Sequence, residues 1–212
     1  MSDQNRTRLF DRWAETYDDA VRSADEFPFG GYEQVLAETV RLATVAPRTS
    51  VLDLGTGTGN LTARFVALGC TVWGIDASAA MLAKARAKVP DAMFMEADVL
   101  GQWPSELPAR FDRIVSAYVL HEFALDMKVG FLRRLAVDHL ADDGRIVLAD
   151  VAFATARARQ LARAKWTDLW DEDEYYWAAD EAIRACERVG LHATYTQVSS
   201  VGGVFVVEPS PL

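Results

Sequence analysis

The chain has 212 residues, half of them hydrophobic and a quarter charged, which is the profile of one globular domain with a sizeable core. No apolar run approaches the roughly 20 residues that span a bilayer, and residues 1–11 do not resemble a signal peptide, so we expect a cytoplasmic protein without a membrane segment. The formal net charge of −9 disfavours nucleic acid, because a polyanion requires a basic surface. We therefore expect a small-molecule partner.

Two elements are predicted before residue 47. Apolar and aromatic residues at helical spacing from Leu9 to Val21 predict an amphipathic helix. Pro28 to Gly31 predict a loop, and a second helix follows from Tyr32 and ends before Pro47. We interpret residues 1–46 as a helical lid.

The pattern then changes to short apolar runs that alternate with helical segments, which is typical of a parallel sheet with crossover helices. A tight turn at Asp142, Asp143 and Gly144 is predicted to lead directly into the fifth strand. The five predicted strands are Ser50–Leu54, Thr71–Ile75, Ala92–Met95, Arg113–Ala117 and Arg145–Ala149.

The tail after Ala152 breaks this rhythm. It predicts two helices and then a β-hairpin, with His192–Val198 and Val204–Val207 joined by a glycine-rich turn. The second helix stops at Gly190, a good C-cap. The first helix contains Leu161, Trp166, Leu169 and Trp170, and the second contains Ala182, Ile183, Cys186 and Val189.

A glycine-rich turn after the first predicted strand points to a nucleotide-like ligand. Gly55, Gly57 and Gly59 permit positive φ and let a ligand approach the backbone. The dinucleotide pattern GxGxxG would need glycine where this chain has Asn60, and Asp53 would repel a pyrophosphate. An ammonium and a sulfonium, as in S-adenosylmethionine (SAM), suit that carboxylate better.

Two further acids end the next two strands. Asp76 is placed to accept hydrogen bonds from both ribose hydroxyls of an adenosine, and Asp98 from the adenine amino group. Asp76 has an alternative role as a helix cap, although Ser78 is also available for capping. With Asp53, three acids fall at the strand ends where open α/β sheets bind ligands.

Other residues are candidates for the methyl acceptor. Tyr118 and His121 follow the fourth strand, and Asp150 ends the fifth, so we predict these three as catalytic; His121 and Asp150 also have purely structural alternatives. His121 would have a pKa suited to a base near neutrality. The acceptor pocket is predicted to enclose a flat or cationic acceptor; its residues are Phe29, His121, Tyr175 and Tyr176, together with Tyr17 of the lid.

Cysteine and histidine positions predict no metal site. Cys70 and Cys186 are far apart and in no CxxC spacing, so we expect two free thiols in a reducing compartment. His121-Glu122 does not begin an HExxH motif, because position 125 is leucine.

The sequence resembles class I SAM-dependent methyltransferases over nearly its whole length, and more narrowly it is similar to small bacterial methyltransferases of the YrrT type. The general resemblance rests on the glycine turn, Asp76, Asp98 and residues 111–117. The narrower one rests on Phe10 to Asp18, Gly74 to Met81 and Asp173 to Tyr176.

This resemblance implies an α/β Rossmann-like fold with a seven-stranded, mostly parallel sheet of order 3-2-1-4-5-7-6. Strand 7 is antiparallel, and helices cover both faces. We expect one domain over residues 1–212, with the lid at 1–46, a SAM-binding core at 47–150, and acceptor-side helices and the hairpin at 151–212. The predicted cofactor contacts are Tyr17, Asp53, Gly55, Thr56, Gly57, Gly59, Asn60, Asp76, Ala77, Met81, Asp98, Val99 and Ser116.

The predicted activity is transfer of the SAM methyl group to a small molecule by in-line displacement, releasing S-adenosylhomocysteine (SAH). The acceptor atom is O, N or S, and the protein is a monomer or homodimer. Two alternatives stay open: a SAM-binding regulatory or partner protein without transferase activity, and an NAD-linked oxidoreductase on a similar fold. RNA methylation is disfavoured by the charge.

Overall fold

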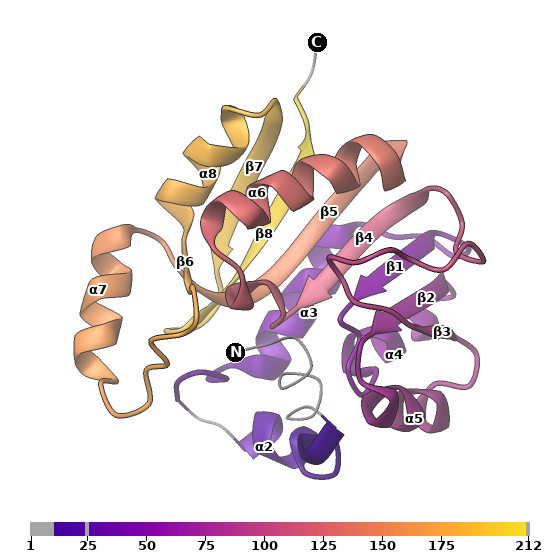
Figure 1. The fold of residues 1–212 in the computed structure, drawn as a ribbon, viewed down its shortest axis with the longest axis horizontal. Helices are drawn as coiled ribbons and strands as arrows, with labels where there is room; N and C mark the ends of the chain where they lie inside the picture. Colours follow the sequence, from indigo (N-terminus) through magenta and orange to yellow (C-terminus); the bar gives the residue numbers. More distant parts are fainter. Residues whose placement is uncertain (1–10, 24–25, 211–212) are drawn as a thin grey trace.

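The computed structural model describes residues 11–23 and 26–210, in which one mixed sheet is covered by helices on both faces (Figure 1). The hydrogen-bonded order is β3-β2-β1-β4-β5-β8-β7, with β8 antiparallel to both of its neighbours, and β6 pairs with β5. The strands are β1 Ser50–Leu54, β2 Thr71–Asp76, β3 Met93–Glu96, β4 Phe111–Ala117, β5 Leu140–Phe153, β6 Trp177–Ala178, β7 Leu191–Gln197 and β8 Gly202–Pro209.

The helices divide between the two faces, so that α3 lies behind the sheet and α6 in front of it in the view of Figure 1. The short helix η1 follows β4, and the π-helical η2 continues α6. The bounds are α2 Tyr17–Ser23, α3 Tyr32–Ala43, α4 Asn60–Ala67, α5 Ala79–Lys88, η1 Leu120–Glu122, α6 Leu125–Arg134, η2 Leu135–His139, α7 Ala156–Lys165 and α8 Ala179–Glu187.

Alternate residues of the central strands build two separate cores. Successive side chains of a strand point to opposite faces, so apolar residues at every position serve both. Val115 and Val147 pack under α3 and α4, whereas Ile114 and Ile146 pack under α6 and α8. Strands buried on both faces hold the sheet rigid, and the carboxyl ends of β1, β2 and β4 end on the side where α2 lies (Figure 1).

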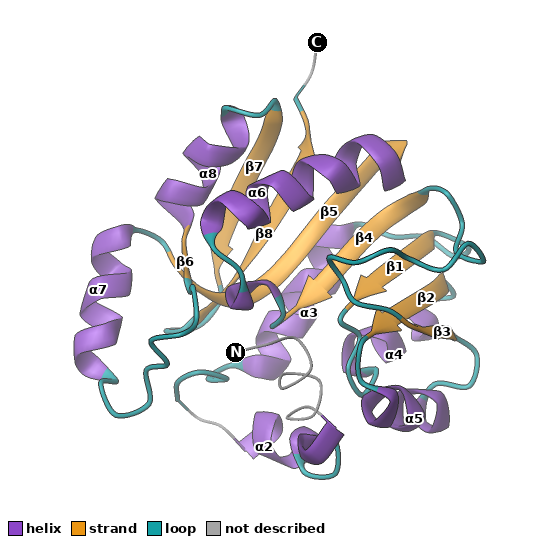
Figure 2. Cartoon of the chain, in the orientation of Figure 1, coloured by secondary structure: helices purple, strands orange, loops and turns teal. Residues whose placement is uncertain are grey.

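The predicted fold class and strand order are confirmed once the two-residue β6, which the sequence did not indicate, is set aside. The hairpin is also confirmed, as β7 and β8. The crossover between β3 and β4, residues 97–110, consists of loops and turns without a helix (Figure 2). None of the helices in residues 11–23 and 26–210 combines the length and apolar character that a bilayer span requires.

The predicted turn at Asp142 to Gly144 was wrong, because these residues lie inside β5 as an irregularity of its pairing with β4. Phe111 pairs with Leu140 and Arg113 with Arg145, so β5 uses more residues than β4 over the same span. A Cβ on Gly144 would lie 2.7 Å from Leu140 Cγ. Glycine is therefore needed for a bulge, not a turn.

The helical predictions near the two ends of the chain also need correction. The first helix is interrupted by turns at residues 14–16, and its predicted start at Leu9 lies outside the described residues. The second predicted lid helix, α3, packs against β5 and β8 in the core. Trp166 is the C-cap of α7, so Leu169 and Trp170 lie beyond that helix.

Candidate active site

The turn between β1 and α4 brings backbone to the edge of the sheet. Gly55, Gly57 and Gly59 have φ of +65°, +54° and +82°, a region that side chains disfavour. A Cβ on Gly55 would also lie 2.4 Å from Val119 Cγ2, in the loop after β4. The first glycine is therefore required twice, by its backbone angle and by the close approach of a neighbouring loop.

Asp53 stabilises this turn through side-chain hydrogen bonds. Its side chain is buried, and one carboxylate oxygen accepts hydrogen bonds from Thr56 Oγ1 at 2.9 Å and Thr62 Oγ1 at 2.6 Å. Burial raises the pKa of Asp53 to about 6, against the lowering effect of the two hydroxyls. Asp53 and Asn60 line a small recess beside the turn.

A larger cleft extends from the turn along the ends of β2 and β3. Asp76 accepts from the backbone N–H of Gly57 and of Ser78, each at 2.8 Å, and burial raises its pKa. Each carboxylate oxygen retains a lone pair for a ligand. Ser78 itself caps α5, accepting from Met81 N at 3.1 Å, so Asp76 is not needed as that cap. The cleft is lined by Tyr17, Gly55, Gly57, Asp76, Ala77, Ser78, Met81, Asp98, Val99, Ala117, Tyr118, Val119, Glu122 and Phe123.

A second cavity of about 310 Å³ adjoins the cleft, and Tyr17, Tyr118 and Glu122 border both. Its wall is assembled from the N-terminal segment, the loop after β4, the end of β5 and the segment between α7 and β6. We call it the acceptor-side cavity. It is lined by Trp13, Tyr17, Pro28, Phe29, Tyr118, His121, Glu122, Val151, Leu169, Asp171, Asp173, Glu174 and Tyr176.

Tyr118 occupies the junction in a strained backbone conformation, with φ of +59°. Its ring stacks on Tyr32 at 5.4 Å and meets Phe29 edge-on at 5.3 Å between centroids. Burial raises the pKa of Tyr118, so the phenol stays protonated at neutral pH. The ring thus serves as a fixed wall where the two spaces meet.

His121, which is part-buried and lines the acceptor-side cavity, pairs with the buried side chain of Asp150. His121 Nδ1 lies 2.5 Å from Asp150 Oδ1, and Trp177 Nε1 donates to Asp150 Oδ2 at 2.9 Å. Burial acts to lower the pKa of His121, but the charge and hydrogen bond of Asp150 outweigh it and raise this pKa to about 9. Burial likewise acts to raise the pKa of Asp150, yet His121 holds it below its ordinary value. The ring is an imidazolium at neutral pH.

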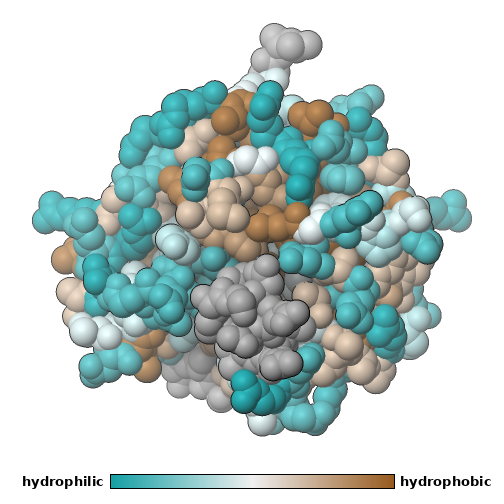
Figure 3. Space-filling view, in the orientation of Figure 1, coloured by the Kyte–Doolittle hydropathy of each residue, from teal (hydrophilic) through white to brown (hydrophobic). Residues whose placement is uncertain are grey.

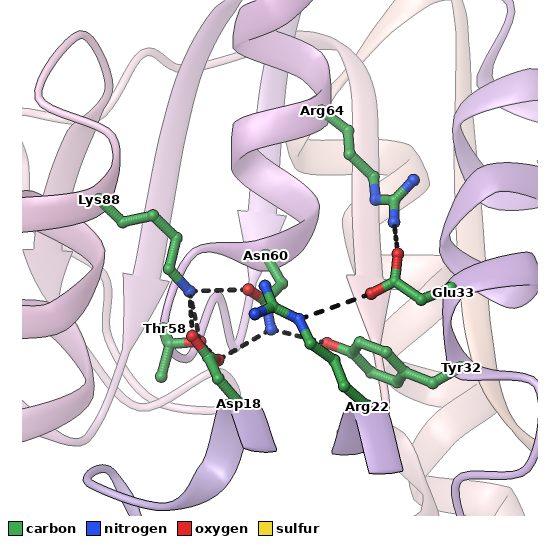
Figure 4. Close-up of polar contacts among 8 residues, drawn as sticks. All are labelled: Asp18, Arg22, Tyr32, Glu33, Thr58, Asn60, Arg64 and Lys88. Carbon is green, nitrogen blue, oxygen red and sulfur yellow. Dashed lines mark hydrogen bonds and ion pairs between the residues drawn. The ribbon is translucent and has the colours of Figure 1, made fainter. Parts of the chain in front are cut away.

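A polar network ties α2 to the glycine turn (Figure 4). Asp18 of α2 accepts from Thr58 Oγ1 at 2.6 Å and Asn60 Nδ2 at 3.0 Å, and it pairs with Lys88 Nζ at 2.6 Å. Burial acts to raise the pKa of Asp18, but these donors together lower it. Asn60 also donates to Tyr32 Oη at 3.1 Å. The network holds α2 against the edge where the cleft opens.

Comparison with known proteins agrees with this geometry. Residues 51–144 match the model of a methyltransferase domain. An uncharacterized methyltransferase of Geobacillus kaustophilus is 36% identical over 94% of each chain, and one of Oceanobacillus iheyensis is 32% identical over 90% of this chain and 91% of its own. The chain belongs to this family of SAM-dependent methyltransferases.

Solved structures share the fold of the methyltransferase at low identity. DhpI, in a structure described as a DhpI-SAM-HEP complex, superposes with a TM-score of 0.73 at 20% identity, covering 99% of this chain and 100% of its own. Magnesium protoporphyrin IX methyltransferase from Synechocystis PCC 6803, with bound SAH, gives a TM-score of 0.67 at 17% identity, covering 97% and 100%.

The structure places most predicted cofactor residues of the methyltransferase around the cleft and the recess. Two are elsewhere. Ser116 is buried between strands and donates to the carbonyl of Leu54 at 2.8 Å, and Gly59 packs against Ala85 of α5. Val119 and Phe123 line the cleft instead and were missed, because nothing in their residue type marks an apolar loop as a ligand wall.

The predicted acceptor residues are partly brought together. Phe29, His121 and Tyr176 line the acceptor-side cavity, whereas Tyr175 is 53% exposed and faces a separate hollow beside Lys128. Asp150 lies behind His121. The prediction that the pKa of His121 suits a base near neutrality was wrong, because its buried carboxylate partner raises it.

Several lining residues of the methyltransferase were not predicted. They include Trp13, at the start of the described chain, and an acidic run between α7 and β6. The aromatic spacing of residues 9–21 and the run Asp171 to Glu174 were the available signals.

Proposed function

We propose that this methyltransferase transfers the methyl group of SAM to a small-molecule acceptor that binds in the acceptor-side cavity, releasing SAH. The observation that carries the proposal is the junction at Tyr17, Tyr118 and Glu122, where the acid-edged cleft opens into the aromatic cavity. A ligand in one space would reach a ligand in the other without crossing solvent. Such a junction is what direct methyl transfer needs.

In this proposal the cleft holds SAM by three parts of the sheet edge. The backbone of the turn at Gly55 and Gly57 approaches the methionine portion. Asp76 accepts from the ribose hydroxyls, and Asp98 from the adenine amino group. The SAM and SAH complexes among the structural neighbours support this donor.

Methyl transfer from a sulfonium needs little activation of the donor. Alignment of the acceptor and removal of its water supply much of the acceleration. The rings of Tyr118 and Phe29 exclude water from the junction. His121 is charged at neutral pH and therefore acts as a hydrogen-bond donor that orients neighbouring groups, not as the proton acceptor.

A small acceptor in the cytoplasm is part of the same proposal. The cavity is bounded by packed side chains, and the formal charge of −9 opposes polyanions. Hydrophilic side chains cover most of the rim of the face in Figure 3, and hydrophobic ones gather nearer its middle. Cys70 and Cys186 are buried free thiols, which is the usual state in a reducing compartment.

The test is incubation of the purified protein with a metabolite extract and SAM labelled in its methyl group, followed by mass identification of labelled products. We expect one small labelled product whose formation is lost when SAH is added in excess. Calorimetry with SAH and NAD runs alongside. Label transferred only to protein or RNA would contradict the acceptor class, and tighter binding of NAD than of SAH would contradict the cofactor.

A further inference from the structure

The acceptor-side cavity has an acidic wall. Asp171, Asp173 and Glu174 line it, and among the described residues around it there is no lysine or arginine. The intervening acid, Glu172, pairs instead with Arg163 at 2.8 Å. Three acidic residues of one short segment therefore border the same cavity, Asp171 and Asp173 at exposed positions and Glu174 at a part-buried one.

Another part of the wall is aromatic. Tyr17 and Phe29 pack nearly edge to face, with centroids 6.4 Å apart, and Phe29 meets Tyr118 at 5.3 Å. The faces of aromatic rings attract cations, most strongly when water is excluded. Rings and carboxylates around one cavity form the set that binds an ammonium group on a flat or apolar body.

His121 is the cationic side chain among the described lining residues, but its charge does not cancel the negative charge of the acidic wall. Its Nδ1 is hydrogen-bonded to Asp150, and its Nε2 lies 3.7 Å from Glu174 Oε1. The imidazolium is thus placed between two carboxylates, which offset its charge. Carboxylates therefore outnumber cationic side chains in the described lining.

From this lining we propose that the methyl acceptor is an amine, bound as an ammonium between the aromatic wall and the carboxylates of Asp171, Asp173 and Glu174, and methylated on nitrogen. The proposal rests on the proposed function and names its substrate class. Phosphorylated and carboxylate-bearing acceptors are disfavoured, since each would place an anion against the acidic wall.

The reaction balances without a further reactant. The ammonium gives one proton to the carboxylate of Glu174, and the freed nitrogen lone pair attacks the methyl carbon of SAM. The N–C bond forms while the S–C bond breaks, and its electron pair stays on sulfur as the neutral thioether of SAH. Positive charge moves from sulfur to nitrogen, toward the acidic wall, which stabilises the transition state. The proton on Glu174 then leaves to solvent.

The experiment measures binding of three probes of one skeleton to the SAH-saturated protein by calorimetry: 2-phenylethylamine, 2-phenylethanol and phenylacetate. We expect the amine to bind at least about tenfold more tightly than the alcohol, and the acid to bind most weakly. Transfer of label from SAM to the amine is measured in parallel. Equal binding of all three probes, tighter binding of phenylacetate, or no binding would overturn the proposal.

Variants of the acidic segment test which residues produce the preference for the amine. Glu174→Gln and Asp173→Asn are each expected to weaken binding of the amine by about fivefold while leaving the alcohol unchanged. Glu172→Gln is the matched control, since it lies in the same segment but pairs with Arg163. If the protein that carries both Asp173→Asn and Glu174→Gln still binds the amine more tightly than the alcohol, the proposal is also overturned. SAH binding distinguishes failure of the proposed function from failure of this inference. A native protein that does not bind SAH would contradict the proposed function. A protein that binds SAH but shows no preference for the amine would contradict this inference alone.

Discussion

The two halves of the proposed active site are built in different ways. The cleft that we propose for the cofactor is built at the ends of β1, β2 and β3, where Gly55, Asp76 and Asp98 occupy positions set by a rigid sheet. The acceptor-side cavity is made of side chains from four segments far apart in the chain. A site fixed at strand ends leaves few alternatives at each position, whereas a wall of side chains from separate segments is free to vary with the acceptor. The following predictions test that contrast, from the largest expected effect to the smallest.

The largest effect is expected at the turn. Gly55→Ala forces a side chain into Val119 at an unfavourable φ, so SAH affinity should fall by more than about 100-fold, with a loss of stability of about 2 kcal/mol or more. Gly190→Ala is the control, because Gly190 also has a positive φ, of +79°, but has nothing within 4 Å of the added atom and does not line the cleft. Calorimetry with SAH and thermal unfolding check both. Equal losses at the two positions would show that the contact with Val119 is unimportant.

Removing an acid at the end of a strand should reduce SAH affinity by a smaller factor. Asp76→Asn is expected to weaken SAH binding by about 10-fold to 100-fold, because a charged acceptor of two hydroxyl hydrogen bonds is replaced by a weaker one. Asp91→Asn, an exposed acid in the next loop, is the control. Calorimetry with SAH checks the pair. Unchanged affinity in Asp76→Asn would remove this residue from the cofactor site.

In the acceptor half, the His121–Asp150 pair should appear in the pH dependence of stability. The pKa of His121 is about 9 in the folded protein and 6.5 ordinarily. Its contribution to the free energy of unfolding is therefore complete below pH 6.5 and is lost as pH rises through 9. The lowered pKa of Asp150 acts at the acid end, where its contribution, present above pH 3.8, is lost as pH falls.

We therefore expect the advantage of the native protein over His121→Gln, in free energy of unfolding by urea, to shrink by about 1 to 3 kcal/mol between pH 6.5 and 9. His192→Gln, at an exposed position on β7, is the control. A constant difference across this range would mean that the pair does not hold a proton on His121.

The smallest effect is expected where α2 meets the turn. Lys88→Ala removes a partner of Asp18 at a part-exposed site, so SAH affinity should fall by about threefold to tenfold, and by less at high salt. Lys84→Ala, on the same helix but paired with exposed Glu15, is the matched control. SAH binding at two salt concentrations checks it. Identical behaviour of the two lysine variants would mean that α2 does not support the cleft.

The amino-acid sequence by itself predicted the cofactor half. The strand order followed from the family resemblance. The glycine turn and the acids at Asp76 and Asp98 are local patterns, and a parallel sheet brings the ends of its strands to one edge whatever the loops do. Its errors there were of detail, such as the bulge at Gly144 and the buried hydroxyl of Ser116.

Only the tertiary structure decided the acceptor half. Trp13, His121 and Glu174 are more than 50 residues apart from one another in the chain, and no spacing rule relates them. The charge state of His121 was equally out of reach, since it depends on burial beside Asp150, 29 residues further along. Side-chain contacts over such separations exist only once the sheet and its loops are folded.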